Sequence, residues 1–237
     1  MRVWLFVEGE SDRLGLEALL RGCGWEQRLR SAGWGVTPIA LSNKSNFLKK
    51  FGDRAAEKLV ASPDDLVVGL PDLHPVAPYQ DGDWRHSDAA TLKEVQRHGV
   101  VRALRDTHHV GGQSADAATR RLFPSVFRHD FEMLLLAAID ELRSHLRTSE
   151  SLGKWRTPVE DQNFNRPPKV IVQELFRSKS PHRREYRETS DAAAVLRRVT
   201  DLRRVVWNQQ GVCMCPEFAK VLDWLSEETG VRACEAR

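Results

Sequence analysis

The feature that most constrains the fold is a short apolar run that stops abruptly at an acidic residue near the N-terminus. Val3–Val7 is continuously apolar and is followed by Glu8 and Gly9. A run of this kind is typical of a strand that is buried in a parallel sheet. Glycine permits the tight turn from the strand into a following helix. Because ligands bind beyond the carboxyl ends of the strands in open α/β sheets, Glu8 is expected at a functional edge.

The helix expected after this turn supplies a second acid. Asp12 follows Glu8 by four positions, and the turn between them brings both carboxylates toward one point. Converging carboxylates are hard oxygen ligands of the kind that bind a divalent cation. Taken alone, the same residues are explained equally well as a turn and a helix cap, with Ser11 or Asp12 in the capping position.

Strand-like and helix-like segments alternate through the first half of the chain, which is typical of a mostly parallel sheet flanked by helices. Further strands are predicted at residues 35–41, 66–70 and 122–127. Helices are predicted at residues 12–21, 46–61, 87–105 and 133–146. The Pro-, Asp- and Gly-rich segment 73–85 and the His- and Gly-rich segment 107–118 are predicted to be loops.

The C-terminal third has a different character. Residues 155–168 are polar with three prolines, and helices are predicted at 169–176, 190–204 and 216–228. We therefore expect an α/β domain over residues 1–150 and a helical C-terminal elaboration over residues 151–237, packed on that domain.

Composition limits the class of protein. In 237 residues the chain has 41% hydrophobic residues, enough for a sizeable core, and no apolar run long enough to cross a bilayer. No export signal is recognised, so a cytoplasmic location is expected. The four cysteines lack paired zinc-finger spacing and are expected to be reduced thiols.

Acids recur just after the predicted strands. Asp72 follows the strand at 66–70, and Asp130 and Glu132 follow the strand at 122–127. Clustered carboxylates repel one another and do not all stay ionised without a compensating cation. One or two Mg²⁺ or Mn²⁺ ions would compensate, and such ions activate water and stabilise a leaving phosphate oxygen.

These residues carry a resemblance to a known family. Val7-Glu8-Gly9-Glu10-Ser11-Asp12, followed by the strand that ends at Asp72, resembles a TOPRIM domain. A closer resemblance covers nearly the whole chain, to the TOPRIM-like family called domain of unknown function 4276, which is related to OLD-family nucleases. It is carried by Glu8-Gly9, by His129-Asp130-Phe131-Glu132-Met133-Leu134-Leu135, by Pro167-Pro168-Lys169 and by Cys215-Pro216-Glu217-Phe218.

The resemblance implies a role for each matching residue. Glu8 corresponds to a metal ligand or general acid/base, and Lys169 to a late lysine that stabilises phosphoryl charge. The other acids that correspond to metal ligands are Asp12, Asp72, Asp130 and Glu132. The implied protein is a Mg²⁺- or Mn²⁺-dependent nuclease that acts on DNA or RNA. Relatives in bacterial anti-phage defence are encoded beside SMC- or ABC-like ATPases, so such an ATPase is the expected partner.

One departure from the TOPRIM pattern bears on the metal site. The position two after Asp72 is His74, where an Asp-x-Asp element has its second acid. Histidine suits softer metals than Mg²⁺, which weakens the case for a second ion. His74 and His129 are secondary candidates for metal or substrate binding. The missing acid also favours the alternative function, a non-catalytic interaction module that partners an ATPase.

Basic residues cluster in the C-terminal part of the chain. Candidate nucleic-acid contacts are Arg177, Lys179, Arg183 and Arg184. Acids are interleaved with them, so a solvated helix face explains the cluster equally well. The formal net charge of only +3 does not decide between the two interpretations. A homo-oligomer also remains open.

Overall fold

The centre of the molecule is a sheet of four parallel strands. The computed structural model describes residues 1–162, 165–180, 183–208 and 210–234. The strands are β1 (Arg2–Val7), β2 (Gly35–Ala40), β3 (Leu66–Leu70) and β4 (Leu122–Pro124). Their spatial order is β2-β1-β3-β4 and every pair is parallel, so all four carboxyl ends lie at one edge of the sheet. The predicted α/β class with a parallel sheet is confirmed.

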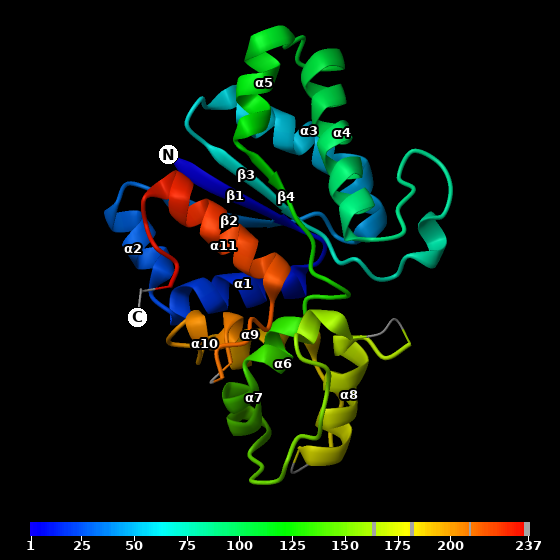
Figure 1. Cartoon of the computed structure of the whole chain (residues 1–237), viewed down its shortest axis with the longest axis vertical. Coiled ribbons are helices and arrows are strands. Elements are labelled where there is room, and N and C mark those ends of the chain that lie inside the picture. The colour runs from blue at the N-terminus through cyan, green and yellow to red at the C-terminus, as the bar shows by residue number, and fades with distance from the viewer. Residues whose placement is uncertain (163–164, 181–182, 209, 235–237) are drawn as a thin grey trace.

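The two faces of the sheet bury different helices (Figure 1). Val3, Leu5 and Val7 of β1 pack on the face that is covered by α1 (Glu10–Gly22) and α2 (Trp25–Ser31). Phe6 points to the opposite face, as expected from the two-residue period of a strand. That face is covered by α3 (Lys44–Ala61), α4 (Ala89–Asp106) and α5 (Gly112–Arg120).

The remaining helices follow β4 in the chain. They are α6 (Met133–Ala137), α7 (Ile139–Leu146), α8 (Pro168–Lys179), α9 (Glu188–Leu196), α10 (Arg203–Val206) and α11 (Pro216–Thr229). Short 3-10 turns occur at Ala77–Tyr79 and Val159–Asp161. Figure 1 shows α6 to α10 beyond α1, on the side away from α3 to α5.

The C-terminal helices share their core with the sheet. α9 packs along α1, and α11 returns to the sheet, where Trp224 stacks on Phe123 of β4 with ring centroids 5.1 Å apart. Buried residues from β1, α1, α6 and α11 form one continuous apolar cluster. This packing fixes the loops after β4 against the sheet edge. The domain boundary at residue 150 stays a prediction.

A close approach between α1 and the segment after β4 depends on glycine. A Cβ at Gly15 would lie 2.3 Å from Cζ of Phe131, which is far inside van der Waals contact. Phe131 stands between Asp130 and Glu132 and packs edge-on against Phe127, with ring centroids 5.2 Å apart. Gly15 therefore lets α1 hold the two acids after β4 close to the turn that carries Glu8.

Several sequence-based element predictions are wrong. Residues 107–118, predicted as a loop, contain most of α5, a helix whose only buried side chain is Ala118 and which has no large apolar side chain to mark it in the sequence. The predicted helix 133–146 is two helices, with a break at Ala138 (ψ 52°). The predicted helix 190–204 ends at Leu196, because the following backbone packs on α1, where a Cβ at Gly22 would lie 2.5 Å from the Arg197 carbonyl oxygen. α2 was not predicted, and β4 ends at Pro124 rather than at residue 127.

Within the ranges that the structure describes, no helix is long and apolar enough to cross a membrane. All four cysteines are free thiols, as predicted.

Candidate metal centre

The acids predicted from the strand ends meet at the carboxyl edge of the sheet. Glu8 follows β1 directly, and its Oε1 accepts a hydrogen bond from the backbone N–H of Asp72, 3.1 Å away, just beyond β3. The charges of Glu8, Asp12, Asp130 and Glu132 all act on the Asp72 carboxyl. The structure thus brings all five candidate acids into one cluster around Asp72.

Burial makes this cluster costly to ionise. Desolvation raises the pKa of Glu8 to about 8, with a further contribution from the charge of Asp12. It likewise raises the pKa of Asp130 to about 7. The pKa values of Asp72 and Glu132 lie well above their usual range, first because of burial and then because neighbouring carboxylates repel. A bound cation would relieve both effects.

The donor atoms of the cluster fit a hard divalent cation. Oδ1 of Asp72 is buried and accepts no hydrogen bond, although buried polar atoms are nearly always paired. Carboxylate oxygens are the ligands that Mg²⁺ and Mn²⁺ prefer. Among the described residues, no group of three or more His, Cys, Asp or Glu side chains is already spaced to hold a metal ion. Ion binding would therefore require the carboxylates to draw closer together.

Two of the acids also organise the backbone around the site. Asp12 accepts from the Gly9 N–H at 2.9 Å and from Ser11 Oγ at 3.1 Å, so it fixes the turn after β1. Both oxygens of Asp130 accept from the backbone N–H of Lys169 at 3.1 Å. Asp130 therefore caps the first turn of α8 rather than the helix that directly follows it. Glu132 accepts a hydrogen bond from the Tyr186 hydroxyl at 3.3 Å.

Lys169 brings a positive charge to the cluster. Its Nζ lies 2.8 Å from Oε1 of Glu188 at the start of α9. Burial alone lowers the pKa of Lys169, but Glu132 and Glu188 outweigh it and raise that pKa. The side chain is 39% exposed, so it is open to a ligand. This placement agrees with the role that the sequence resemblance implies.

A second lysine was missed by the sequence analysis. Lys44 begins α3, just beyond β2, and is only 5% exposed. Its Nζ donates to the carbonyl oxygens of Leu73 at 2.6 Å and Pro75 at 2.9 Å. Its charge acts on both Glu8 and Asp72. The signal was present, because Lys44 follows the strand predicted at 35–41, but only acids were predicted as site residues at the strand ends.

The two candidate histidines lie beside each other on one flank of the cluster. The backbone N–H of His74 donates to the His129 carbonyl oxygen at 2.7 Å. Burial lowers the pKa of His129 to about 4 and also lowers the pKa of His74, so both rings are neutral at pH 7. A cavity of about 880 Å³ opens next to them, lined in part by Arg128, His129 and Arg156.

The chain was compared with known proteins. The sequence profile of a domain of unknown function, DUF4276, matches residues 7–226. This chain belongs to the DUF4276 family. No curated protein and no solved structure matches it. The matched residues include all five acids and both lysines of the site, so the cluster lies inside the region that defines the family.

The predicted nucleic-acid contacts of this DUF4276 protein lie at the far end of α8. Arg177 pairs with Glu185 at 3.2 Å, Lys179 with Glu150, and Arg184 with Asp191 at 2.6 Å. Arg183 is exposed with a positive φ of 43°. Arg177 is about 12 Å along the helix axis from Lys169, at the usual rise per residue. The ion pairs compensate most of this charge, and nucleic-acid binding there stays a prediction.

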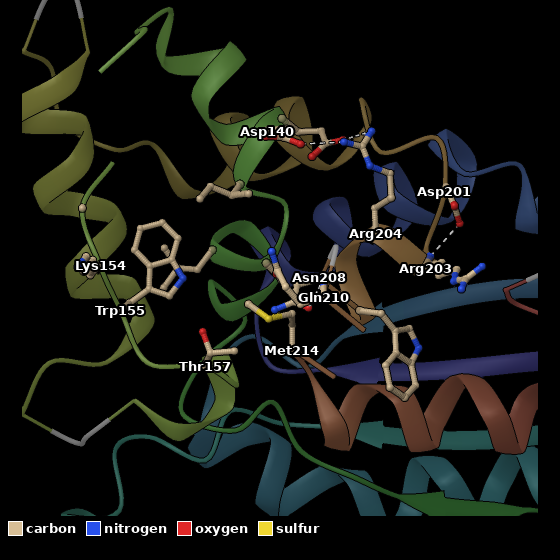
Figure 2. Close-up of a pocket in the computed structure, with 16 residues that line it drawn as sticks. Asp140, Lys154, Trp155, Thr157, Asp201, Arg203, Arg204, Asn208, Gln210 and Met214 are labelled. Carbon is tan, nitrogen blue, oxygen red and sulfur yellow. Dashed lines mark hydrogen bonds and ion pairs between the residues drawn. The ribbon is translucent and has the colours of Figure 1, made fainter. Parts of the chain in front are cut away.

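A further cavity of the DUF4276 protein, of about 700 Å³, lies between α6, α7 and α10 (Figure 2). Its apolar lining includes Trp155, Trp207 and Met214. Arg204 reaches toward Asp140, 2.8 Å away. The formal charges of the residues that line this cavity cancel. Three are positive and three negative: Lys154, Arg203 and Arg204, and Asp140, Glu141 and Asp201. No sequence motif predicted this cavity.

Proposed function

We propose that this DUF4276 protein is a divalent-metal-dependent nuclease that hydrolyses nucleic-acid phosphodiesters on a TOPRIM-like sheet related to that of OLD-family nucleases. The observation that carries the proposal is the acid cluster around Asp72, whose buried Oδ1 accepts no hydrogen bond. Buried carboxylates that repel one another and are raised in pKa are typical of functional sites rather than of structural ion pairs.

The metal would be held mainly by Glu8, Asp72 and Glu132. Both oxygens of Asp12 and of Asp130 already accept hydrogen bonds, whereas Glu8 and Glu132 each use one oxygen in this way. When bound, Mg²⁺ or Mn²⁺ supplies positive charge to the phosphate and lowers the pKa of a coordinated water. In hydrolysis the water oxygen joins phosphorus, a P–O ester bond breaks, and the water proton passes to a base while the leaving oxygen takes up a proton. The sequence resemblance assigns to Glu8 either that proton transfer or a place among the metal ligands.

Asp130 and Glu188 position the positive charge of Lys169, which lies in the first turn of α8. Asp130 holds the first turn of α8 through the Lys169 N–H, and Glu188 holds the Lys169 ammonium at 2.8 Å. Lys169 then stands beside the acid cluster, where negative charge develops on a phosphoryl group. Asp130 and Glu188 act through Lys169 and are positioning residues.

The biological setting rests on the sequence resemblance alone. We propose that the protein is the effector subunit of a bacterial anti-phage system and works with an SMC- or ABC-like ATPase, in the cytoplasm. The substrate is DNA or RNA. Fold likeness by itself does not establish such a role, so partner and substrate are tested separately from the chemistry.

Cleavage assays with purified protein test the chemistry. Single- and double-stranded DNA and RNA are incubated with Mg²⁺ or Mn²⁺, with and without the neighbouring ATPase. Glu8→Gln and Glu132→Gln are each expected to lower the rate by at least about 100-fold, the usual cost of losing a group that stabilises the transition state. Glu94→Gln, an exposed acid on α4, is the matched control and keeps the wild-type rate. Equal cleavage by Glu8→Gln and wild type would reject the proposal.

A second candidate function has its own supporting observation. The cations of Lys44 and Lys169 already lie within charge-interaction range of the acids, and no set of three candidate ligands among the described residues is spaced for an ion. Both facts suit a non-catalytic module that binds an ATPase. Calorimetric titration with Mn²⁺ separates the two functions: the module takes up no ion even with its partner present, whereas the nuclease binds Mn²⁺ in a Glu8-dependent way.

A further inference from the structure

Lys44 occupies a built cation site within the acid cluster. A lysine ammonium has three N–H donors, and two of them are given to the carbonyl oxygens of Leu73 and Pro75. The Tyr79 ring lies 5.3 Å from Nζ and closes another side. With 5% exposure, the ammonium is held in place and is not a mobile surface charge. One N–H remains for a ligand.

The groups around this ammonium are those that a metal ion would use. Backbone carbonyl and carboxylate oxygens are ordinary ligands of hard divalent cations. Leu73 and Pro75 supply the carbonyl oxygens, and the carboxylates of Glu8 and Asp72 lie close enough for their charges to act on Lys44. The carbonyl oxygens of such a set are therefore already bonded to a cation of the chain itself, and the carboxylates lie within range of its charge.

The sequence of the same loop agrees with this picture. Lys44 bonds the carbonyl groups on either side of His74, and His74 is the position at which an Asp-x-Asp element would have its second acid. An acid there would add a ligand for another metal ion. This chain has a neutral ring at that position and a fixed positive charge beside it.

We propose that Lys44 takes the place of a second metal ion, so that the centre works with one divalent ion per chain and the Lys44 ammonium as its other cation. The inference rests on the proposed nuclease function and specifies which cations act at that site. The remaining N–H of Lys44 contacts a non-bridging oxygen of the substrate phosphate, while Glu8, Asp72 and Glu132 hold the single ion.

The stoichiometry of metal binding tests the proposal on the wild-type chain. Isothermal titration of the metal-free protein with Mn²⁺ is expected to give one ion per chain, and Glu8→Gln is expected to abolish that uptake. Two Mn²⁺ ions per chain, both lost in Glu8→Gln, would overturn the inference but leave the nuclease proposal intact. No uptake by the wild type overturns both.

The variant Lys44→Gln gives a readout that a purely structural role would not produce. Removing a positive charge next to the ion should tighten Mn²⁺ binding by roughly tenfold, as expected for a unit charge a few ångströms away. Cleavage should nevertheless fall on the order of 100-fold, because a cation that stabilises the transition state is lost. Metal affinity and rate therefore move in opposite directions. Lys50→Gln, an exposed lysine on the same helix, is the control and changes neither.

The remaining outcomes also decide. If Lys44→Gln melts at the wild-type temperature but binds Mn²⁺ more weakly and cleaves more slowly, Lys44 is only a scaffold for the loop at residues 72–75, and the inference is overturned. If the variant does not fold, the wild-type stoichiometry alone decides. If one ion binds and binds more tightly in Lys44→Gln, yet no substrate is cleaved, the single-ion site stands and the nuclease proposal fails.

Discussion

At the scale of single residues, the acids of the cluster have divided tasks. Burial raises the pKa values of the Asp72 and Glu132 carboxyl groups well above their usual range, whereas both oxygens of Asp130 accept hydrogen bonds from the first turn of α8. A carboxylate at a helix N-terminus stabilises the helix by bonding its free N–H groups. Sequence position alone does not distinguish an acid that caps a helix from one that is available to an ion, since Asp130 and Glu132 lie two residues apart after β4.

Substitutions of Asp130 separate capping from metal binding. Asp130→Asn keeps an oxygen that accepts from the Lys169 N–H, so we expect near wild-type stability and cleavage within a few-fold of wild type. Asp130→Ala removes the cap and should cost about 1 kcal/mol of unfolding free energy. It should also slow cleavage, because Lys169 loses its position. Urea unfolding and cleavage rates of both variants test this, and a loss of Mn²⁺ binding in Asp130→Asn would show that Asp130 is a ligand after all.

At the scale of elements, the site depends on how closely α1 approaches the segment after β4. Gly15→Ala would place a Cβ 2.3 Å from the Phe131 ring, so the two elements must separate. Overpacking of this kind costs about 1–3 kcal/mol. We expect lower stability and weaker Mn²⁺ binding, because Phe131 stands between Asp130 and Glu132.

A glycine-to-alanine change elsewhere provides the control. At Gly99 in the middle of α4, a Cβ would meet Cα of Gly52 at 3.7 Å, an ordinary contact. Since alanine is the better helix former, Gly99→Ala should raise the free energy of unfolding by about 0.5–1 kcal/mol and leave Mn²⁺ binding unchanged. Chemical denaturation of both variants measures the contrast. Equal stability changes at positions 15 and 99 would contradict the packing argument.

The elements also show what local sequence can and does not determine. The strands β1 and β3 and the acids after them were predicted correctly, because an apolar run and the residue that ends it are local features. The break at Ala138 and the end of α9 were not, since the packing of residues 197–199 on Gly22 is a tertiary contact. Lys44 was missed for a related reason: its function depends on the carbonyl groups of Leu73 and Pro75, which no pattern around residue 44 reveals.

At the scale of the whole molecule, metal and stability are linked through the buried carboxyl groups. Glu8 has a pKa of about 8 in the folded protein against an ordinary value of 4.5, and Asp72 and Glu132 are raised as well. A carboxyl whose pKa is raised by folding contributes stability below its unfolded pKa and loses it as the pH rises through the folded pKa. The metal-free protein should therefore become less stable from pH 7 to pH 8.

Other buried groups also titrate near this window. The histidines, with pKa values lowered by burial, are neutral above pH 7 and contribute little there. Asp130 and Glu160, whose pKa values burial raises to about 7, act in the same direction as Glu8. Lys44, whose pKa burial lowers to about 8, acts in the opposite direction, and its effect grows toward pH 8. Each carboxyl that keeps its proton contributes a slope of at most about 1.4 kcal/mol per pH unit. Glu8→Gln removes one such group and should give a flatter profile than wild type.

Mn²⁺ should reverse this trend. An ion binds the ionised carboxylates and not the protonated ones, so its stabilising effect grows as the pH rises from 7 to 8. Urea unfolding in EDTA and in excess Mn²⁺ at several pH values measures both slopes. Stability in EDTA that rises across the window would contradict the raised pKa values, and an Mn²⁺ effect that shrinks with pH would mean that the ion binds elsewhere. If the metal-free protein loses stability from pH 7 to pH 8 while the Mn²⁺-bound protein gains it, the acid cluster destabilises the fold by itself. Its carboxylates are then explained by ion binding and not by a contribution to folding.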